Sequence, residues 1–118
     1  MRWPRRRASP SDYADYYANA QADQTNLNQI GADLVADGVD VIVAVATPTA
    51  ATMLAAVEDT DIPVVYSAVT DPAAAGFDTE PNITGTSDAL NTDAIMNLIL
   101  AVNPDIDTIG LLYDLSQD

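Results

Sequence analysis

Apolar and polar residues alternate along the chain in short blocks that have the periods of helices and strands. In residues 23–38 the apolar side chains recur at helical spacing, at Leu27, Ile30, Leu34 and Val35. Asp23 or Thr25 is placed to cap the start of this helix, and Gly38 occupies the position of a left-handed residue after its end. The pattern therefore predicts a helix across this segment.

Two valine-rich runs, residues 39–46 and 62–70, predict strands. The first run is continuously apolar, which suits a strand that is buried on both faces of a parallel sheet. The residues between the runs are rich in alanine and favour a helix, with Thr47 as its N-cap and Pro48 as its first helical residue.

The rest of the chain continues this alternation. Residues 82–88 predict a short strand or edge segment, and residues 107–114 predict a further strand. Between them, residues 91–102 predict a helix with Ile95, Leu98, Ile99 and Val102 on one face. An aromatic stretch at residues 14–20 suggests another short strand. Strands and helices that alternate at this spacing are typical of an α/β fold with a parallel sheet and right-handed crossovers.

Charge and composition exclude several classes of function. The chain of 118 residues has a net charge of −14, its only basic residues are Arg2, Arg5, Arg6 and Arg7, and it contains neither histidine nor cysteine. So acidic a body repels nucleic acid, and the missing ligand types argue against a metal site. The acidity fits a solvated surface, or alternatively a salt-rich habitat. No apolar run approaches the roughly 18 residues of a membrane-spanning helix.

Polar residues follow the first predicted strand, where the carboxyl end of a parallel strand would face a ligand. The sequence there is Thr47-Pro48-Thr49. Because a helix starts at this point, its free backbone amides would favour a carboxylate or another anion. The alternative is that Thr47 only caps its own helix.

The second predicted strand ends in Thr70 and Asp71, before Pro72. The carboxylate of Asp71, together with the backbone carbonyl of Ala68 and the hydroxyl of Thr70, would suit an ammonium group. An anion site and an ammonium site at neighbouring strand ends would together hold a zwitterion. The alternative is an Asp-Pro turn that needs no ligand.

Sequence motifs of enzymes are not found in the chain. It lacks the glycine-rich dinucleotide and phosphate loops and the G-x-S-x-G nucleophile motif. Asp71 at a strand end suggests the phospho-accepting aspartate of a receiver domain, but that site also needs a lysine, which is absent. A small α/β enzyme stays an alternative with few residues to support it. We therefore expect a non-enzymatic binding module without a cofactor.

Three blocks of the sequence resemble the tryptophan/tyrosine-type family of ABC transporter substrate-binding proteins. They are "VDVIVAVATPTA", "PVVYSAVTDP" and "NITGTSD", within a likeness that runs from about residue 16 to residue 114. The resemblance implies a type I periplasmic-binding fold, in which each of two lobes is a three-layer sandwich with a parallel sheet and the ligand lies in the cleft between lobes.

The resemblance also implies ligand contacts and partners. The contacts would come from Thr47, Pro48, Thr49, Ala68, Thr70, Asp71, Ser87 and Asp88, around an amino-acid-like, aromatic ligand. The partner would be an ABC permease, with no role for nucleic acid, and the location would be periplasmic or extracellular and membrane-associated. The alternative is the effector-sensing domain of a LacI-type transcription regulator, which shares the fold but carries an N-terminal helix-turn-helix that this sequence does not contain.

Compared with the family, the chain is expected to be truncated at both ends. We expect residues 1–15 to be disordered or non-native, residues 16–106 to form an incomplete first lobe, and residues 107–118 to begin the second lobe. A single lobe supplies only half of the cleft, so we expect binding by this chain to be impaired. No signal peptide is recognisable in it, because no apolar segment follows the arginines.

Overall fold

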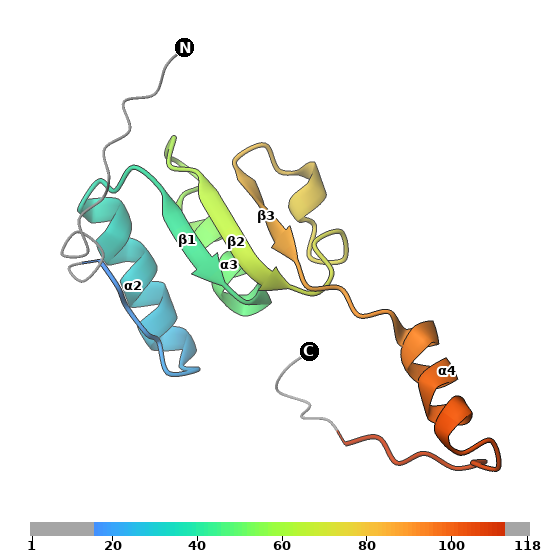
Figure 1. Cartoon of the computed structure of the whole chain (residues 1–118). Helices are drawn as coiled ribbons and strands as arrows, with labels where there is room; N and C mark the ends of the chain where they lie inside the picture. The colour runs from blue at the N-terminus through green and yellow to red at the C-terminus, as the bar shows by residue number, and fades with distance from the viewer. Residues whose placement is uncertain (1–15, 113–118) are drawn as a thin grey trace.

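Three parallel strands form the sheet, in a computed structural model that describes residues 16–112. The strands are β1 (Ile42–Val45), β2 (Val64–Val69) and β3 (Ile83–Ser87), and they lie in the order β1-β2-β3 (Figure 1). Val64 of the central strand pairs with Ile42 on one side and with Ile83 on the other. The predicted α/β class and parallel sheet are confirmed, with strands shorter than the sequence pattern suggested.

One helix covers a face of this sheet, and a second helix packs on the first. Helix α3 (Thr47–Ala56) packs on β1 and β2, and helix α2 (Gln24–Ala36) packs on α3. The carboxylate of Asp23 caps α2 by accepting a hydrogen bond from the amide of Asn26 at 2.8 Å, and Gly38 follows the helix with a φ of +66°. The predictions for both ends of α2 are confirmed.

The core lies between these helices and the sheet. Its buried side chains are Leu27, Ile42, Ala44, Ala50, Met53, Val57, Val64, Val69, Phe77 and Ile83. Phe77 comes from a short 3-10 helix, η1 (Phe77–Thr79), and its ring packs on Tyr66 with 5.6 Å between the ring centroids. Phe77 thus adds an aromatic side chain to the core on the side where η1 contacts β3.

The opposite face of the sheet is open within residues 16–112. Val43 and Val45 alternate with the buried residues of β1 and are 67% and 60% exposed. The expectation that this strand is buried on both faces is therefore wrong for the described structure, because no helix covers its second face. Of the three layers expected for a lobe, the described residues form the sheet and one helical layer.

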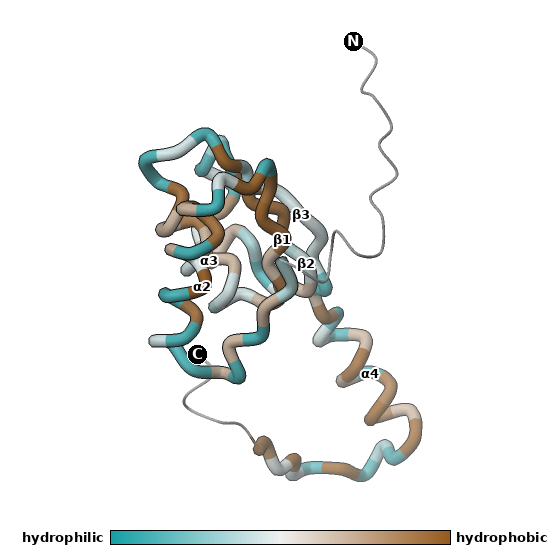
Figure 2. Tube along the Cα trace, turned by 90° about the vertical axis from the view of Figure 1, so that its left-hand side faces the viewer, coloured by the Kyte–Doolittle hydropathy of each residue, from teal (hydrophilic) through white to brown (hydrophobic). Residues whose placement is uncertain are grey.

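Helix α4 (Thr92–Val102) stands apart from the sheet (Figure 1). Asn91 caps it by accepting a hydrogen bond from the amide of Ala94 at 3.0 Å. The helix is apolar along most of its length, as Figure 2 shows in brown, yet none of its residues is buried. The predicted helix is confirmed, but its predicted apolar face packs on nothing in the described structure.

Three local predictions are wrong. Helix α3 has Ala46 as its N-cap, so Thr47 is its first residue and Pro48 its second. The segment 16–20 forms no strand, although residues 14 and 15 lie outside the described part. No strand forms at 107–112 either, because these residues have no neighbouring strand to pair with; residues 113 and 114 are not described. The expected N-terminal segment 1–15 also lies outside the described residues.

Candidate functional site

The carboxyl ends of the three strands lie side by side at one edge of the sheet. The amide of Ala46, after β1, donates a hydrogen bond to the carbonyl oxygen of Ser67 in β2 at 2.9 Å. The amide of Asp88, after β3, donates to the carbonyl oxygen of Val69 at 3.2 Å. Parallel pairing therefore brings the three predicted groups of site residues to one edge, with the outer two separated by two strand spacings, roughly 10 Å.

The first group of site residues, Thr47, Pro48 and Thr49, forms the first turn of α3. Within the described residues no side chain caps this helix. The first intrahelical bond joins the amide of Ala50 to the carbonyl oxygen of Ala46 at 3.0 Å, so the amides of Thr47 and Thr49 precede the hydrogen-bonded ladder. The alternative in which Thr47 merely caps its helix is therefore wrong, and the turn keeps the partial positive charge that favours an anion.

The second group lies at the end of the central strand and is exposed. Ala68 is the last residue but one of β2, and Thr70 and Asp71 follow the strand. One carboxylate oxygen of Asp71 accepts a hydrogen bond from the amide of Ala74 at 2.9 Å, and the Asp71 carbonyl oxygen accepts one from Ala75 at 3.1 Å. Asp71 thus stabilises the turn after β2, as the alternative of an Asp-Pro turn predicts. Because that bond uses Oδ1, a turn role and a contact from Oδ2 to an ammonium group are compatible.

The third group, Ser87 and Asp88, ends β3. The hydroxyl of Ser87 donates a hydrogen bond to the carbonyl oxygen of Thr70 at 3.2 Å, and its oxygen accepts one from the amide of Ala89 at 3.1 Å. Ser87 therefore acts as a brace between the second and third strand ends. Asp88 is exposed beside it and adds a second carboxylate to this side of the edge.

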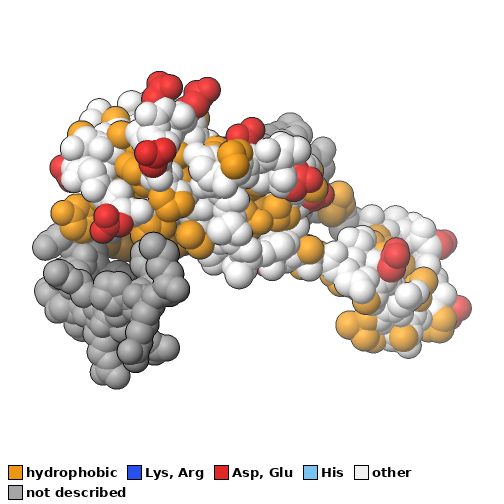
Figure 3. All heavy atoms as spheres, turned by 90° about the horizontal axis from the view of Figure 1, so that it is seen from above, with side chains coloured by type: hydrophobic (Ala, Val, Ile, Leu, Met, Phe, Trp, Pro, Cys, Tyr) orange, Lys and Arg blue, Asp and Glu red, His pale blue; other side chains and the backbone are white. Residues whose placement is uncertain are grey.

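All formal side-chain charge in residues 16–112 is negative, because the four arginines precede residue 16. Carboxylates are distributed over the surface in Figure 3, and no basic side chain lies among them in the coloured part. No group of three or more potential metal ligands comes together in the described part of the chain. A ligand at the strand ends would therefore meet carboxylates at β2 and β3, and backbone amides at the start of α3.

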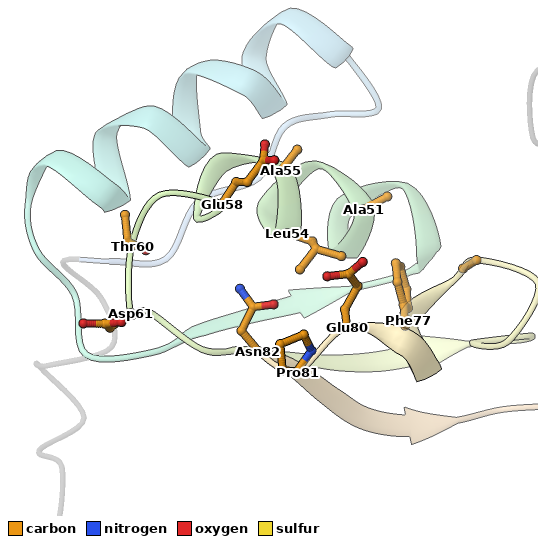
Figure 4. Close-up of a pocket in the computed structure, with 11 residues that line it drawn as sticks. Ala51, Leu54, Ala55, Glu58, Thr60, Asp61, Phe77, Glu80, Pro81 and Asn82 are labelled. Atoms are coloured by element: carbon orange, nitrogen blue, oxygen red, sulfur yellow. The ribbon is translucent and has the colours of Figure 1, made fainter.

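A groove of about 620 Å³ lies elsewhere, between the C-terminal half of α3 and the loops before β2 and β3. Leu54 and Glu58 line it from α3, and Phe77, Glu80 and Asn82 line it from the other side (Figure 4). Because Asn82 precedes β3, the groove belongs to the amino ends of the strands. None of the eight predicted site residues lines it.

A profile of the family of ABC transporter substrate binding proteins matches residues 10–118. The chain belongs to this family. A tyrosine-binding protein of Clostridioides difficile is 35% identical over 106 residues, which are 86% of this chain and 30% of that protein. The match to a family of binding proteins does not favour a LacI-type regulator or an enzyme.

Two solved structures are similar to this substrate-binding family member. A conserved domain protein from Vibrio cholerae superposes with a TM-score of 0.76 at 34% identity, over 86% of this chain and 35% of that one. An ABC domain in complex with L-Trp from Streptococcus pneumonia superposes with a TM-score of 0.70 at 37% identity, over 80% and 34%. The chain therefore spans about a third of the length of these relatives.

Two strand ends of this family member have an unusual backbone that no pattern in the sequence predicted. Ala46 has a φ of +74° and Ala68 a φ of +55°, in a region that residues other than glycine seldom adopt. Alanine has no preference for this conformation, so no sequence signal marked either position for this role.

A helix long and apolar enough to cross a membrane is not found in the described part of the chain.

Proposed function

We propose that the three strand ends form one wall of the solute-binding cleft of an ABC-type import system, and that the ligand is an aromatic amino acid in its zwitterionic form. The single observation that carries this is the pairing at one edge of an uncapped helix start with exposed carboxylates. The names of a tyrosine-binding and a tryptophan-bound relative support the aromatic side chain.

In this proposal each group of site residues contacts a different part of the ligand. The amides of Thr47 and Thr49, with the Thr47 hydroxyl, accept the carboxylate, and Pro48 shapes that turn. Asp71, with the Thr70 hydroxyl and the Ala68 carbonyl, accepts the ammonium group, and Asp88 adds a second negative charge. Ser87 holds the β2 and β3 ends together. The side chain of the ligand points away from the sheet.

The proposed partner is an ABC permease, and the proposed location is periplasmic or extracellular, as for an importer that captures solute outside the membrane. Thr47 and Thr49 are half-buried and the other proposed contacts are exposed, so water competes for each of them. We therefore propose that this chain binds in the millimolar range, more weakly than a protein that encloses its ligand.

Thermal melting with and without ligand tests the proposal. At a concentration ten times the dissociation constant, a ligand stabilises the folded state by about 1.4 kcal/mol, which raises the melting temperature by several degrees. L-tryptophan and L-tyrosine should give this shift. Tryptamine, which lacks the carboxylate, and indole-3-propionate, which lacks the ammonium group, are matched controls and should give smaller shifts.

Two results would contradict the proposal. One is a melting temperature that does not respond to millimolar aromatic amino acids. The other is an equal response to either control compound, because a zwitterion site must use both charged groups.

A further inference from the structure

Two alanines with positive φ lie at adjacent strand ends, Ala46 directly before Thr47 and Ala68 two residues before Thr70. The carbonyl of Ala68 is itself one of the proposed ligand contacts. Ala46 has a φ of +74° and a ψ of +156°, which is a region that glycine alone adopts readily. Ala68 has a φ of +55°. At Gly38 and Gly76 the same chain uses glycine for positive φ. Gln21 and Ala22, in the turn before α2, are the other non-glycine examples among the described residues.

Hydrogen bonds on both sides hold Ala46 in this conformation. Its amide donates to the carbonyl oxygen of Ser67 at 2.9 Å, which fixes the end of β1 against β2. Its carbonyl oxygen accepts from the amide of Ala50 at 3.0 Å, which starts α3. The peptide units before and after Ala46 are thereby fixed to different elements. The unusual φ is what lets the chain turn at once from the strand into the uncapped helix start.

Ala68 lies in a bulge of the central strand. Tyr66 pairs with Gly85 and Val69 with Ser87, so three steps along β2 match two steps along β3. One extra residue reverses the alternation of side chains between the two faces of a sheet. Val69 is consequently fully buried, and Ala68 and Thr70 are exposed. Without the bulge, Val69 would face the open side and Thr70 the core.

We infer that Ala46 and Ala68 are positioning residues, which hold the backbone of Thr47–Thr49 and of Thr70–Asp71 in place before a ligand arrives. This inference rests on the proposed function for the identity of the ligand, but not for the backbone state. Glycine would adopt the same conformations with less strain and would allow many others. Alanine excludes those alternatives, so a ligand meets an ordered edge and loses less entropy on binding.

Alanine-to-glycine variants separate this role from a purely structural one. Ala32, exposed on helix α2, gives the matched control: Ala32→Gly should lower the melting temperature by about 4–8 °C, because glycine is a poor helix former. Ala46→Gly and Ala68→Gly should leave the melting temperature of the ligand-free chain unchanged or raise it, because each relieves strain. An ordinary negative φ at Ala46 and Ala68 would instead predict a loss in all three variants.

Amide hydrogen exchange gives the second readout, and it needs no ligand. In Ala46→Gly the amide of Ala50, which donates to the carbonyl oxygen of residue 46, should exchange about two- to fivefold faster, and in Ala68→Gly the amide of Asp88, which donates to the carbonyl oxygen of Val69, should do so. The core amides of β2 should not change. If the proposed function holds, L-tryptophan should bind both variants about two- to fivefold more weakly, although neither has lost stability.

The outcomes are distinguishable. The inference is overturned if either variant loses as much stability as Ala32→Gly, or if local exchange is unchanged. It is also overturned if the β2 amides of the original chain are unprotected, because the strained edge would then not form. If the original chain and both variants ignore every aromatic amino acid while melting and exchange behave as expected, the proposed ligand is wrong and the positioning role of the two alanines stands.

Discussion

The hydroxyl of Ser87 donates a hydrogen bond to the backbone carbonyl oxygen of Thr70 at 3.2 Å, which joins the ends of β3 and β2. Its oxygen also accepts from the amide of Ala89 at 3.1 Å. Both carboxylates proposed for the ammonium group follow these two ends, Asp71 after Thr70 and Asp88 after Ser87. A single side chain thus sets the relative placement of the two acidic strand ends.

Replacing Ser87 with alanine should lower the free energy of unfolding by about 0.5–1 kcal/mol, because exposed hydrogen bonds contribute modestly. Urea denaturation measures this change. Ser87→Thr keeps the hydroxyl, suits a strand and serves as the control. A Ser87→Ala variant as stable as the original chain, with unchanged amide exchange at Asp88 and Ala89, would show that the brace is unimportant.

Asp71 has two roles that substitutions can separate. Asp71→Asn keeps the oxygen that accepts from Ala74 and removes the charge, so the free energy of unfolding should stay within about 0.5 kcal/mol of the original. Asp71→Ala removes both and should lose about 1 kcal/mol. In calorimetric titrations with L-tryptophan, both variants should bind at least about tenfold more weakly, because a charge-assisted bond is lost. If Asp71→Asn binds like the original chain, the ammonium site lies elsewhere.

Gly85 lies directly against Tyr66 on the neighbouring strand. A Cβ atom at position 85 would overlap the carbonyl oxygen and the ring of Tyr66, and that ring also packs on Phe77. Gly85→Ala should therefore destabilise the fold by about 1–3 kcal/mol in thermal or urea melts. Gly110→Ala is the control, because a Cβ there meets nothing within 4 Å. Equal stability of the two variants would contradict the close approach of β2 and β3.

Two methionines differ in burial and should differ in effect. Met53 of α3 is 2% exposed in the core, whereas Met96 of α4 is 41% exposed. Met53→Ala should lose about 2–5 kcal/mol of stability, and Met96→Ala should change it by no more than about 0.5 kcal/mol. Met53→Leu keeps the volume, should cost less than about 1.5 kcal/mol, and gives a folded comparison if Met53→Ala unfolds. A large loss in Met96→Ala would mean that α4 packs on another surface.

The acidic surface predicts a stability that rises with salt. Within residues 16–112 each carboxylate has only other carboxylates as charged neighbours, so their repulsion opposes the compact state. Raising sodium chloride from about 20 to about 500 mM shortens the screening length from roughly 20 Å to roughly 4 Å and should raise the melting temperature. Potassium chloride should act equally, because screening does not depend on which cation is present. A lower melting temperature in salt would contradict this account.

The sequence predicted those elements whose own residues determine them. The helix α2 has its apolar spacing, its Asp23 cap and its terminal Gly38 within one continuous segment, and all three appear as expected. The strand predicted for residues 107–114 does not form over its described part, because a strand depends on residues outside its own segment. A strand needs a neighbour for its backbone hydrogen bonds, and residues 107–112 have none in the described structure.

The sequence by itself determined the α/β class, the parallel sheet and the polar character of its strand ends, because apolar period and turn chemistry act over a few residues. Only the tertiary structure decided which groups stay free at those ends. The start of α3 is uncapped because Ala46, and not Thr47, precedes it. Thr70 is exposed because the bulge at Ala68 shifts which side chains of β2 face the core. Both depend on hydrogen bonds between segments far apart in the chain, which no local pattern encodes.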